Sequence, residues 1–451
     1  MQEQEDQVRN VTEHTFGTWR SQESWKAPLD IERAEGVFFF DSRGKQYLDF
    51  SSQLMCSNLG HGNRAIIDAI CKQASRLPYI APSFTCQAKA AAVTALKEVL
   101  PPGLDSMFFS TSGTEANEAA VKMIRQLGRQ ENKFKIISRY RSYHGSTGAS
   151  IALTGDPRRW FAEPTGTVPG VVFAPDAYCY RCPFGLTHPH CGIRCADYVE
   201  YMIEEEGNVA AMIVEPIVGT NGVIVPPDEY LPKLRDITSK HGVLLVADEV
   251  MSGWYRTGTA FAVDHWGVVP DVLTTAKGCT GAYTPVGITV TTRAIKNAFE
   301  KMFFAHGHTY SMHPLMIAAI PAAVSEYKKL VSGGLPKRVS AHIGRRLSEL
   351  YDRHESIGDV RGIGHFWAIE LVRDRRTKEP FNTKADKAAL RPLAVSRLTA
   401  KMLERGLYVV GWYNHLIIAP PLIITEEEVD RGIQILDETL KAADREVRGG
   451  S

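Results

Sequence analysis

The chain has 451 residues, of which 44% are hydrophobic and 23% are charged, and its formal net charge at pH 7 is +1. This length suits two or three domains with a substantial core, and the near-neutral charge excludes an electrostatic case for binding nucleic acid or an anionic membrane. No apolar stretch is long enough for a membrane-spanning helix, and the first residues are acidic and polar, so we expect a cytoplasmic protein with small-molecule partners.

The first predicted elements are two short strands, at residues 36–41 and 46–50. Between residues 62 and 325, helical segments such as residues 115–128 alternate with short apolar strands. These strands are expected at residues 134–137, 170–173, 210–214 and 243–247. The alternation predicts an α/β fold with a mostly parallel sheet covered by helices, and a ligand site at the carboxyl ends of its strands.

The last third of the chain reads as a second, α+β unit. A helix is expected at residues 314–331, followed by strands at residues 366–371 and 415–419 with helices between and after them. We therefore predict three parts. They are an N-terminal segment that contributes to the small domain (residues 1–61), a large domain (residues 62–325) and a C-terminal small domain (residues 326–451).

A lysine after one buried strand points to a covalently bound cofactor. Lys277 lies in the small-residue turn TTAKG, and Asp248 ends the apolar run VLLVAD that precedes it. A lysine amine can bind the aldehyde of pyridoxal phosphate, and a carboxylate can keep the pyridine nitrogen protonated so that the ring accepts electrons. The pair predicts an enzyme dependent on pyridoxal 5'-phosphate, with Lys277 and Asp248 as catalytic residues.

Four motifs in the same order resemble those of the class III (ω-) aminotransferases, which are pyridoxal phosphate enzymes of fold type I. The motifs are STSGTEANE at residues 110–118, SYHG at 142–145, VEP and DEV at 214–216 and 248–250, and GHTYS at 307–311. The resemblance covers nearly the whole chain. It implies a large domain like that of aspartate aminotransferase, a smaller α+β domain, and ping-pong transfer of an amino group from an amine donor to a 2-oxo acid acceptor.

The resemblance also implies which residues bind the cofactor. They are Ser112, Gly113, Thr114, Tyr143, His144, Glu215, Asp248, Val250, Lys277 and Thr309. The first three would hold the phosphate at a helix N-terminus, where free backbone N–H groups suit an anion. Tyr143 and Val250 would contact opposite faces of the ring. Thr309 would reach the phosphate of the neighbouring subunit, which implies a homodimer with shared active sites, and dimers could pair into a tetramer.

Two departures from the family pattern bear on the substrate. Ser146 stands where 4-aminobutyrate and ornithine enzymes have an arginine, and YHGST at residues 143–147 instead resembles ω-amine and taurine aminotransferases. No arginine lies between residues 406 and 420, where the relatives have a mobile one that binds the acceptor carboxylate. We consider Arg158 or Arg159 as the replacement.

These features favour amines, taurine and β- or ω-amino acids as donors, and pyruvate as the acceptor. Five residues fall at the family's substrate-lining positions or at the place of the missing arginine: Leu54, Met55, Tyr79, Phe84 and Trp412. For each of them, packing at a domain interface is an equally good explanation.

Other functions remain open. A taurine or 4-aminobutyrate aminotransferase that uses 2-oxoglutarate would fit, and a decarboxylase or aminomutase of the same fold would share Lys277 and Asp248. A nicotinamide-dependent oxidoreductase would require a Gly-x-Gly-x-x-Gly motif after the first strand, which the chain lacks.

Four of the eight cysteines cluster in the sequence: Cys179, Cys182, Cys191 and Cys195. Their spacing suits a tetrahedral zinc site that ties down a long loop. Loop packing also accounts for it, and aminotransferase chemistry requires no metal. We therefore predict no metal, with these four cysteines as the only candidate ligands.

Overall fold

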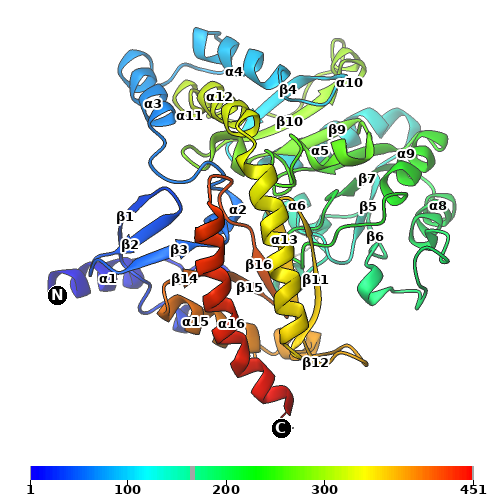
Figure 1. Ribbon diagram of the computed structural model, residues 1–451. Coiled ribbons are helices and arrows are strands. Elements are labelled where there is room, and N and C mark those ends of the chain that lie inside the picture. Colours follow the sequence, from blue (N-terminus) through cyan, green and yellow to red (C-terminus); the bar gives the residue numbers. More distant parts are fainter. Residues whose placement is uncertain (1, 163–167, 449–451) are drawn as a thin grey trace.

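The computed structural model describes residues 2–162 and 168–448, which form three β-sheets covered by helices (Figure 1). The largest sheet has seven strands in the order β4-β10-β9-β8-β7-β5-β6. They are β4 (Leu104–Ser110), β5 (Lys135–Arg139), β6 (Val171–Ala174), β7 (Val209–Val214), β8 (Leu244–Asp248), β9 (Val272–Thr275) and β10 (Gly287–Thr292). Within this sheet only β10 runs antiparallel to its neighbours, so the predicted mostly parallel sheet is confirmed.

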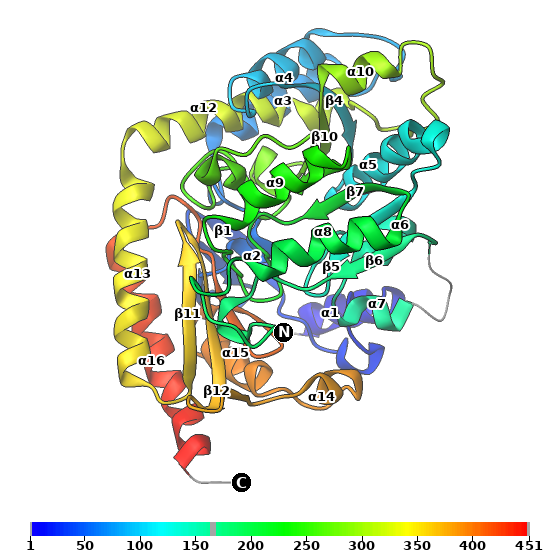
Figure 2. The same cartoon turned by 90° about the vertical axis from the view of Figure 1, so that its right-hand side faces the viewer.

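Helices cover both faces of this sheet. Successive residues of a strand point to opposite faces, so Ile136 packs toward α5 (Gly113–Gly128) and α6 (Gly148–Leu153). Ile137 packs toward α8 (Arg194–Glu206) and α9 (Tyr230–Lys240), which lie in front of the strands in Figure 2. Burial on both faces explains why these strands appear in the sequence as continuous apolar runs, such as β7, in which every residue is buried.

A second sheet lies in the C-terminal third of the chain. Its strands are β11 (Ile357–Ile363), β12 (Phe366–Asp374), β13 (Glu379–Pro380), β15 (Val410–Trp412) and β16 (His415–Ile418). The helices α13 (Leu335–Arg353), α15 (Ala394–Glu404) and α16 (Glu426–Arg448) share one hydrophobic core with it, and α13 and α16 lie side by side in both views.

The third sheet joins the two ends of the chain. It consists of β1 (Ile31–Glu35), β2 (Phe38–Asp41), β3 (Gln46–Asp49) and β14 (Leu407–Tyr408), and β14 runs parallel to β3. This pairing supports a structural link between the N-terminal segment and the C-terminal third. The domain boundaries at residues 61 and 325 stay a prediction.

The other helices are α1 (Gln2–His14), α2 (Ser52–Met55), α3 (Arg64–Arg76), α4 (Gln87–Lys97), α7 (Pro157–Ala162), α10 (Arg293–Ala298), α11 (Pro314–Ile317), α12 (Ala319–Ser332) and α14 (Lys384–Ala388). The helix expected at residues 314–331 is divided into α11 and α12, because Pro321 has no N–H to donate to the carbonyl of Ile317. Among residues 2–162 and 168–448, no helix is long and apolar enough to cross a membrane.

Candidate active site

A cavity of about 330 Å³ lies at the carboxyl ends of the parallel strands β5, β7, β8 and β9. Residues of the large sheet, of the N-terminal segment and of β15 all contribute to its wall. They are Trp19, Leu54, Met55, Gly113, Thr114, Asn117, Tyr143, His144, Gly145, Arg158, Glu215, Thr220, Asp248, Val250, Met251, Lys277, Val410 and Trp412. Ligand sites of open α/β sheets lie at this end of the strands.

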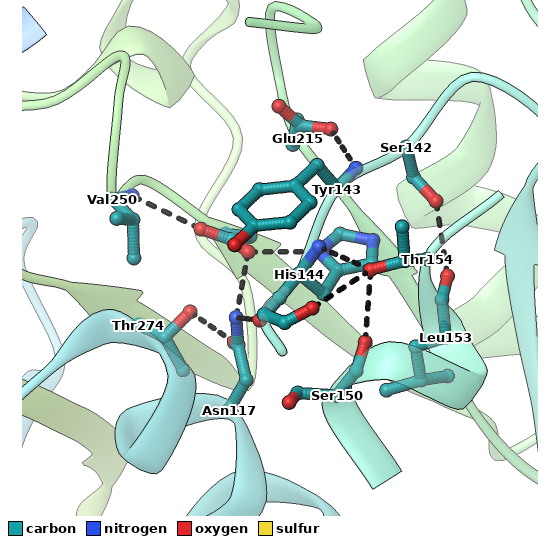
Figure 3. Close-up of polar contacts among 12 residues, drawn as sticks. Asn117, Ser142, Tyr143, His144, Ser150, Leu153, Thr154, Glu215, Val250 and Thr274 are labelled. Carbon is teal, nitrogen blue, oxygen red and sulfur yellow. Dashed lines mark hydrogen bonds and ion pairs between the residues drawn. The ribbon is translucent and has the colours of Figure 1, made fainter. Parts of the chain in front are cut away.

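Asp248, the last residue of β8, is buried in a network of donors, whose members Asn117, His144 and Val250 are labelled in Figure 3. One carboxylate oxygen accepts hydrogen bonds from Nδ2 of Asn117 at 2.8 Å and from Nδ1 of His144 at 2.7 Å. The other accepts the N–H of Val250 at 3.0 Å. Thr274 donates to Oδ1 of Asn117, which fixes the orientation of that amide. Three donors around one carboxylate hold it in place as an anion beneath the cavity.

Glu215, at the end of β7, is a second buried carboxylate in the wall. It accepts the backbone N–H of Tyr143 at 2.9 Å and that of Gly219 at 2.8 Å. Burial raises the pKa of Glu215. These bonds hold Tyr143 at the turn after β5, with its ring beside the Asp248 network in Figure 3.

Lys277 opens a short 3-10 turn directly after β9. Its backbone φ is +41°, in the left-handed region that non-glycine residues rarely adopt. Burial lowers the pKa of its amine, and the positive charge of Arg158 acts in the same direction. A buried amine with a lowered pKa releases its proton more readily, which suits a nucleophile or a base.

The N-terminus of α5 forms another side of the cavity through Gly113 and Thr114. A Cβ at Gly113 would lie 2.8 Å from Cγ1 of Val250, so the backbone can come this close only as glycine. An amine, a buried carboxylate and a helix N-terminus in one wall are the three groups that the aldehyde, pyridine nitrogen and phosphate of pyridoxal phosphate require. The residues present therefore fit this cofactor.

Arg158 brings a cation into the same wall. Its guanidinium carbon lies 3.6 Å from the centre of the Tyr143 ring, 4.6 Å from that of Trp412 and 5.5 Å from that of Trp19. Nε of Arg158 also donates to both carboxylate oxygens of Asp156, at 3.1 and 2.9 Å. The three rings and one carboxylate hold the guanidinium in a fixed position at the cavity.

The structure brings most of the predicted site residues together, but it does not place all of them in the cavity. Ser112 caps α5 and accepts the N–H of Glu115 with its hydroxyl. Tyr79 and Phe84 are 40% and 60% exposed elsewhere on the chain, and the hydroxyl of Tyr79 donates to the carbonyl of Thr309 at 3.1 Å. The sequence suggested that these two residues line the cavity, but in the structure they lie outside the cavity of their own chain.

Six of the cavity residues were not predicted as site residues: Trp19, Asn117, Gly145, Thr220, Met251 and Val410. Asn117 could have been found, because it lies one helical turn after Gly113 in the same motif and so on the same face of α5.

The predicted cysteine cluster lies apart from this cavity. All four of its thiols are free, and they line a separate small cavity after β6. Within the described ranges, the only three or more metal-ligand atoms that all lie within 4.8 Å of one another belong to Glu200, Glu204 and His241. Lys240 forms an ion pair with Glu200 at 2.7 Å, so an ammonium already competes for that cluster.

Comparisons with known proteins agree with this geometry. The profile of the class-III aminotransferases matches residues 20–440. The putrescine–pyruvate aminotransferase of Pseudomonas aeruginosa is 34% identical over 91% of each chain, and the taurine–pyruvate aminotransferase of Rhodobacter capsulatus is 35% identical over 92% of each. The solved structure of a taurine:2-oxoglutarate aminotransferase from Bifidobacterium kashiwanohense, in complex with pyridoxal phosphate and glutamate, has a TM-score of 0.92 at 34% identity and covers 98% of this chain and 99% of its own.

Proposed function

Because the chain belongs to the class-III aminotransferases, we propose that it transfers the amino group of an amine, taurine or a β- or ω-amino acid to a 2-oxo acid, with pyruvate favoured as the acceptor. As a member of this family it is a pyridoxal-phosphate-dependent aminotransferase of fold type I. The observation that carries the substrate proposal is the position of Arg158, which places a guanidinium in the same cavity as the Lys277 amine.

Bound pyridoxal phosphate supplies an aldehyde that takes up amines and a ring that withdraws electrons. In our proposal Asp248 holds the proton on the ring nitrogen, and His144 and Asn117 keep this carboxylate oriented. Gly113 and Thr114 hold the phosphate through backbone N–H groups, with Ser112 fixing the start of the helix.

Four further residues complete this assignment. Tyr143 and Val250 flank the ring, and Glu215 positions Tyr143 through its backbone N–H. Lys277 would take the proton from the carbon that carries the substrate amine and deliver it to the former aldehyde carbon of the bound cofactor. Burial lowers the pKa of this amine, which makes its uncharged, proton-accepting form easier to reach.

Arg158 replaces the arginine that the segment at residues 406–420 lacks. A guanidinium binds a carboxylate or sulfonate through paired hydrogen bonds, and here it lies in the cavity wall rather than on a mobile loop. A second cation lies nearby, since Nζ of Lys387 is 4.3 Å from the centre of the Trp412 ring. Two cations around one aromatic ring favour substrates with an anionic group, such as taurine, β-alanine and pyruvate.

We also propose a homodimer in which Thr309 of each subunit serves the active site of the other. Thr309 and Tyr79 lie together, and Tyr310, whose ring contacts that of Tyr79, is 55% exposed. Exposed aromatic side chains of this size are common at protein interfaces. An association of dimers into tetramers remains an expectation. The eight free cysteines suit the reducing cytoplasm, where we expect the enzyme to act.

The test is to mix the yellow holoenzyme with single donors in the absence of an acceptor. Taurine, β-alanine, 1-phenylethylamine, L-alanine and L-glutamate are added separately, and the visible absorbance of the lysine-bound cofactor is followed. We expect taurine, amines and L-alanine to bleach it and L-glutamate to leave it unchanged. Bleaching by L-glutamate would instead support an enzyme that uses 2-oxoglutarate, and release of carbon dioxide would identify a decarboxylase.

A further inference from the structure

A long connection that is mostly irregular joins β6 to α8. It spans residues 175–193, and the short 3-10 turn Cys179–Arg181 is the regular element described within it. Loops of this length are uncommon inside compact domains unless they are functional or tied down. Three of the four clustered cysteines lie in this connection, and the fourth, Cys195, lies in the first turn of α8.

The four thiols surround one small cavity of about 20 Å³, together with His188 and Arg194. That volume is roughly the space that one water molecule or one ion occupies, and it is too small for an iron–sulfur cluster. Cys182, Cys191 and Cys195 are partly buried, and Cys179 is exposed. The loop thus folds its cysteines around one common space.

The sulfur atoms surround the cavity without yet being in ligand geometry. Among the described residues, no three of them all lie within 4.8 Å of one another. Neutral thiols have no mutual attraction that would draw them closer. Zinc–sulfur bonds of about 2.3 Å bring tetrahedral ligands to about 3.8 Å from one another, which rotation of the cysteine side chains around a central ion can achieve.

Cations surround the same loop. Arg194 lines the cavity, and Nζ of Lys378 donates to the carbonyl of Tyr180 at 2.7 Å. Nζ of Lys233 donates to the carbonyl of Gly192 at 3.0 Å and is also paired with Asp197. A zinc ion with four thiolates carries a net charge of about −2. Positive groups held at the backbone of the loop offset that charge.

We propose that Cys179, Cys182, Cys191 and Cys195 bind one structural zinc ion that fixes the connection between β6 and α8. Each thiol loses its proton to solvent when it binds, and no electron is transferred. His188 is not a ligand in this proposal, since its Nε2 lies 3.3 Å from a carboxylate oxygen of Glu229.

The loop also contacts the C-terminal sheet. Nε of Arg181, between the first two cysteines, donates to Oε1 of Glu370 at 2.5 Å, and Oε2 of Glu370 lies 3.2 Å from Nε2 of His415. His415 pairs with Trp412 of the active-site wall. Loss of the ion is therefore expected to lower the thermal stability of the whole enzyme.

The experiment measures zinc in tag-free holoenzyme by plasma mass spectrometry. We expect one zinc per chain in the wild type and in Cys71→Ser, because Cys71 is exposed on α3 and outside the cluster. The variants Cys182→Ser and Cys191→Ser should lose the ion and melt at a lower temperature. Replacement of zinc by cobalt in the wild type should produce the absorption bands of a tetrahedral thiolate site, at longer wavelengths than the cofactor band.

Three results would overturn the proposal. The first is a wild type that contains no zinc after incubation with zinc chloride, and the second is equal zinc content in all variants. The third is mass spectrometry of the non-reduced protein that shows the four cysteines joined in disulfides. The cobalt spectrum of the wild type keeps the test decisive even if a serine variant does not fold.

Discussion

Nδ1 of His144 lies 2.7 Å from Oδ2 of Asp248, and neither side chain is more than 3% exposed. An ionised carboxylate can only accept hydrogen bonds, so the histidine carries its proton on Nδ1 and faces the carboxylate as a donor. Asn117 adds a second donor to the same oxygen. These two donors orient the aspartate before any cofactor binds. A substitution that keeps the shape of the side chain and removes its charge therefore tests what the charge contributes.

Asp248→Asn keeps the shape of the side chain and removes the charge. We expect kcat to fall on the order of 10²–10³-fold, the usual loss when one group that stabilises developing charge is removed. Steady-state kinetics with saturating donor and acceptor measure the change, and circular dichroism checks the fold. Asp236→Asn, an exposed aspartate on α9, is the control and should keep full activity. Wild-type kcat in Asp248→Asn would contradict the role.

Arg158→Gln should discriminate between substrates. A charge-assisted hydrogen bond contributes about 1.5–3 kcal/mol, so we expect KM for taurine and pyruvate to rise roughly tenfold or more. KM for 1-phenylethylamine, which carries no anionic group, should change little. Arg129→Gln, at an exposed arginine, serves as the control. A uniform loss for all substrates would show that Arg158 supports the wall rather than recognising an acid.

Glu249 predicts a pH dependence of stability. Burial raises its pKa from 4.5 to about 7. Because the folded pKa is above the unfolded one, the stabilising contribution is complete below pH 4.5 and is lost as the pH rises through about 7. The loss is on the order of 3 kcal/mol once the buried group is charged.

Glu249→Gln should remove this slope, because its amide can accept the N–H of Val263 and bond Ser252 as the protonated acid does. Urea unfolding at about pH 5 and about pH 8 measures the difference between wild type and variant. The exposed Glu300→Gln is the control. Equal slopes for wild type and Glu249→Gln would refute a raised pKa.

The shared active site can be tested by mixing inactive variants. Lys277→Ala should abolish turnover in a folded protein. If Thr309 serves the partner's site, a mixed dimer of Lys277→Ala and Thr309→Ala subunits contains one intact site and regains activity. A mixed dimer of Lys277→Ala and Asp248→Asn subunits contains none and stays inactive. The subunits are exchanged in dilute urea and activity is then measured; no recovery in the first mixture would place Thr309 in its own subunit's site.

Much of the fold could be predicted, and the reason is visible in the strands. β5, β7 and β8 are buried on both faces and so appear as apolar runs, whereas β9 and β10 are rich in threonine and were not predicted. Most of their threonines are buried, and burial is tolerated because hydroxyls such as that of Thr274, which donates to Asn117, are hydrogen-bonded. Polar residues satisfied in this way leave no apolar pattern in the sequence.

The cavity was predicted where one motif carried the signal and was missed where separate segments meet. Asp248 ends a recognisable apolar run and Lys277 lies in the small-residue turn that comes next in the chain, whereas Trp19 and Trp412 reach Arg158 from opposite ends of the chain. No local pattern connects residues so far apart. Tyr79 and Phe84 were assigned to the cavity by resemblance alone. In this chain both are exposed, and Tyr79 lies beside the segment that contains Thr309.

The left-handed backbone at Lys277 has a consequence for heat tolerance. A non-glycine residue in this region costs on the order of 1–3 kcal/mol, which the surrounding structure must supply. The supporting contacts are close by: Nε1 of Trp254 donates to Thr275, and the hydroxyl of Tyr327 donates to the carbonyl of Gly278. If heating loosens these contacts first, the turn relaxes and the amine swings away from the cofactor while the sheets remain folded. Thermal inactivation of this enzyme should then begin below the temperature at which it unfolds.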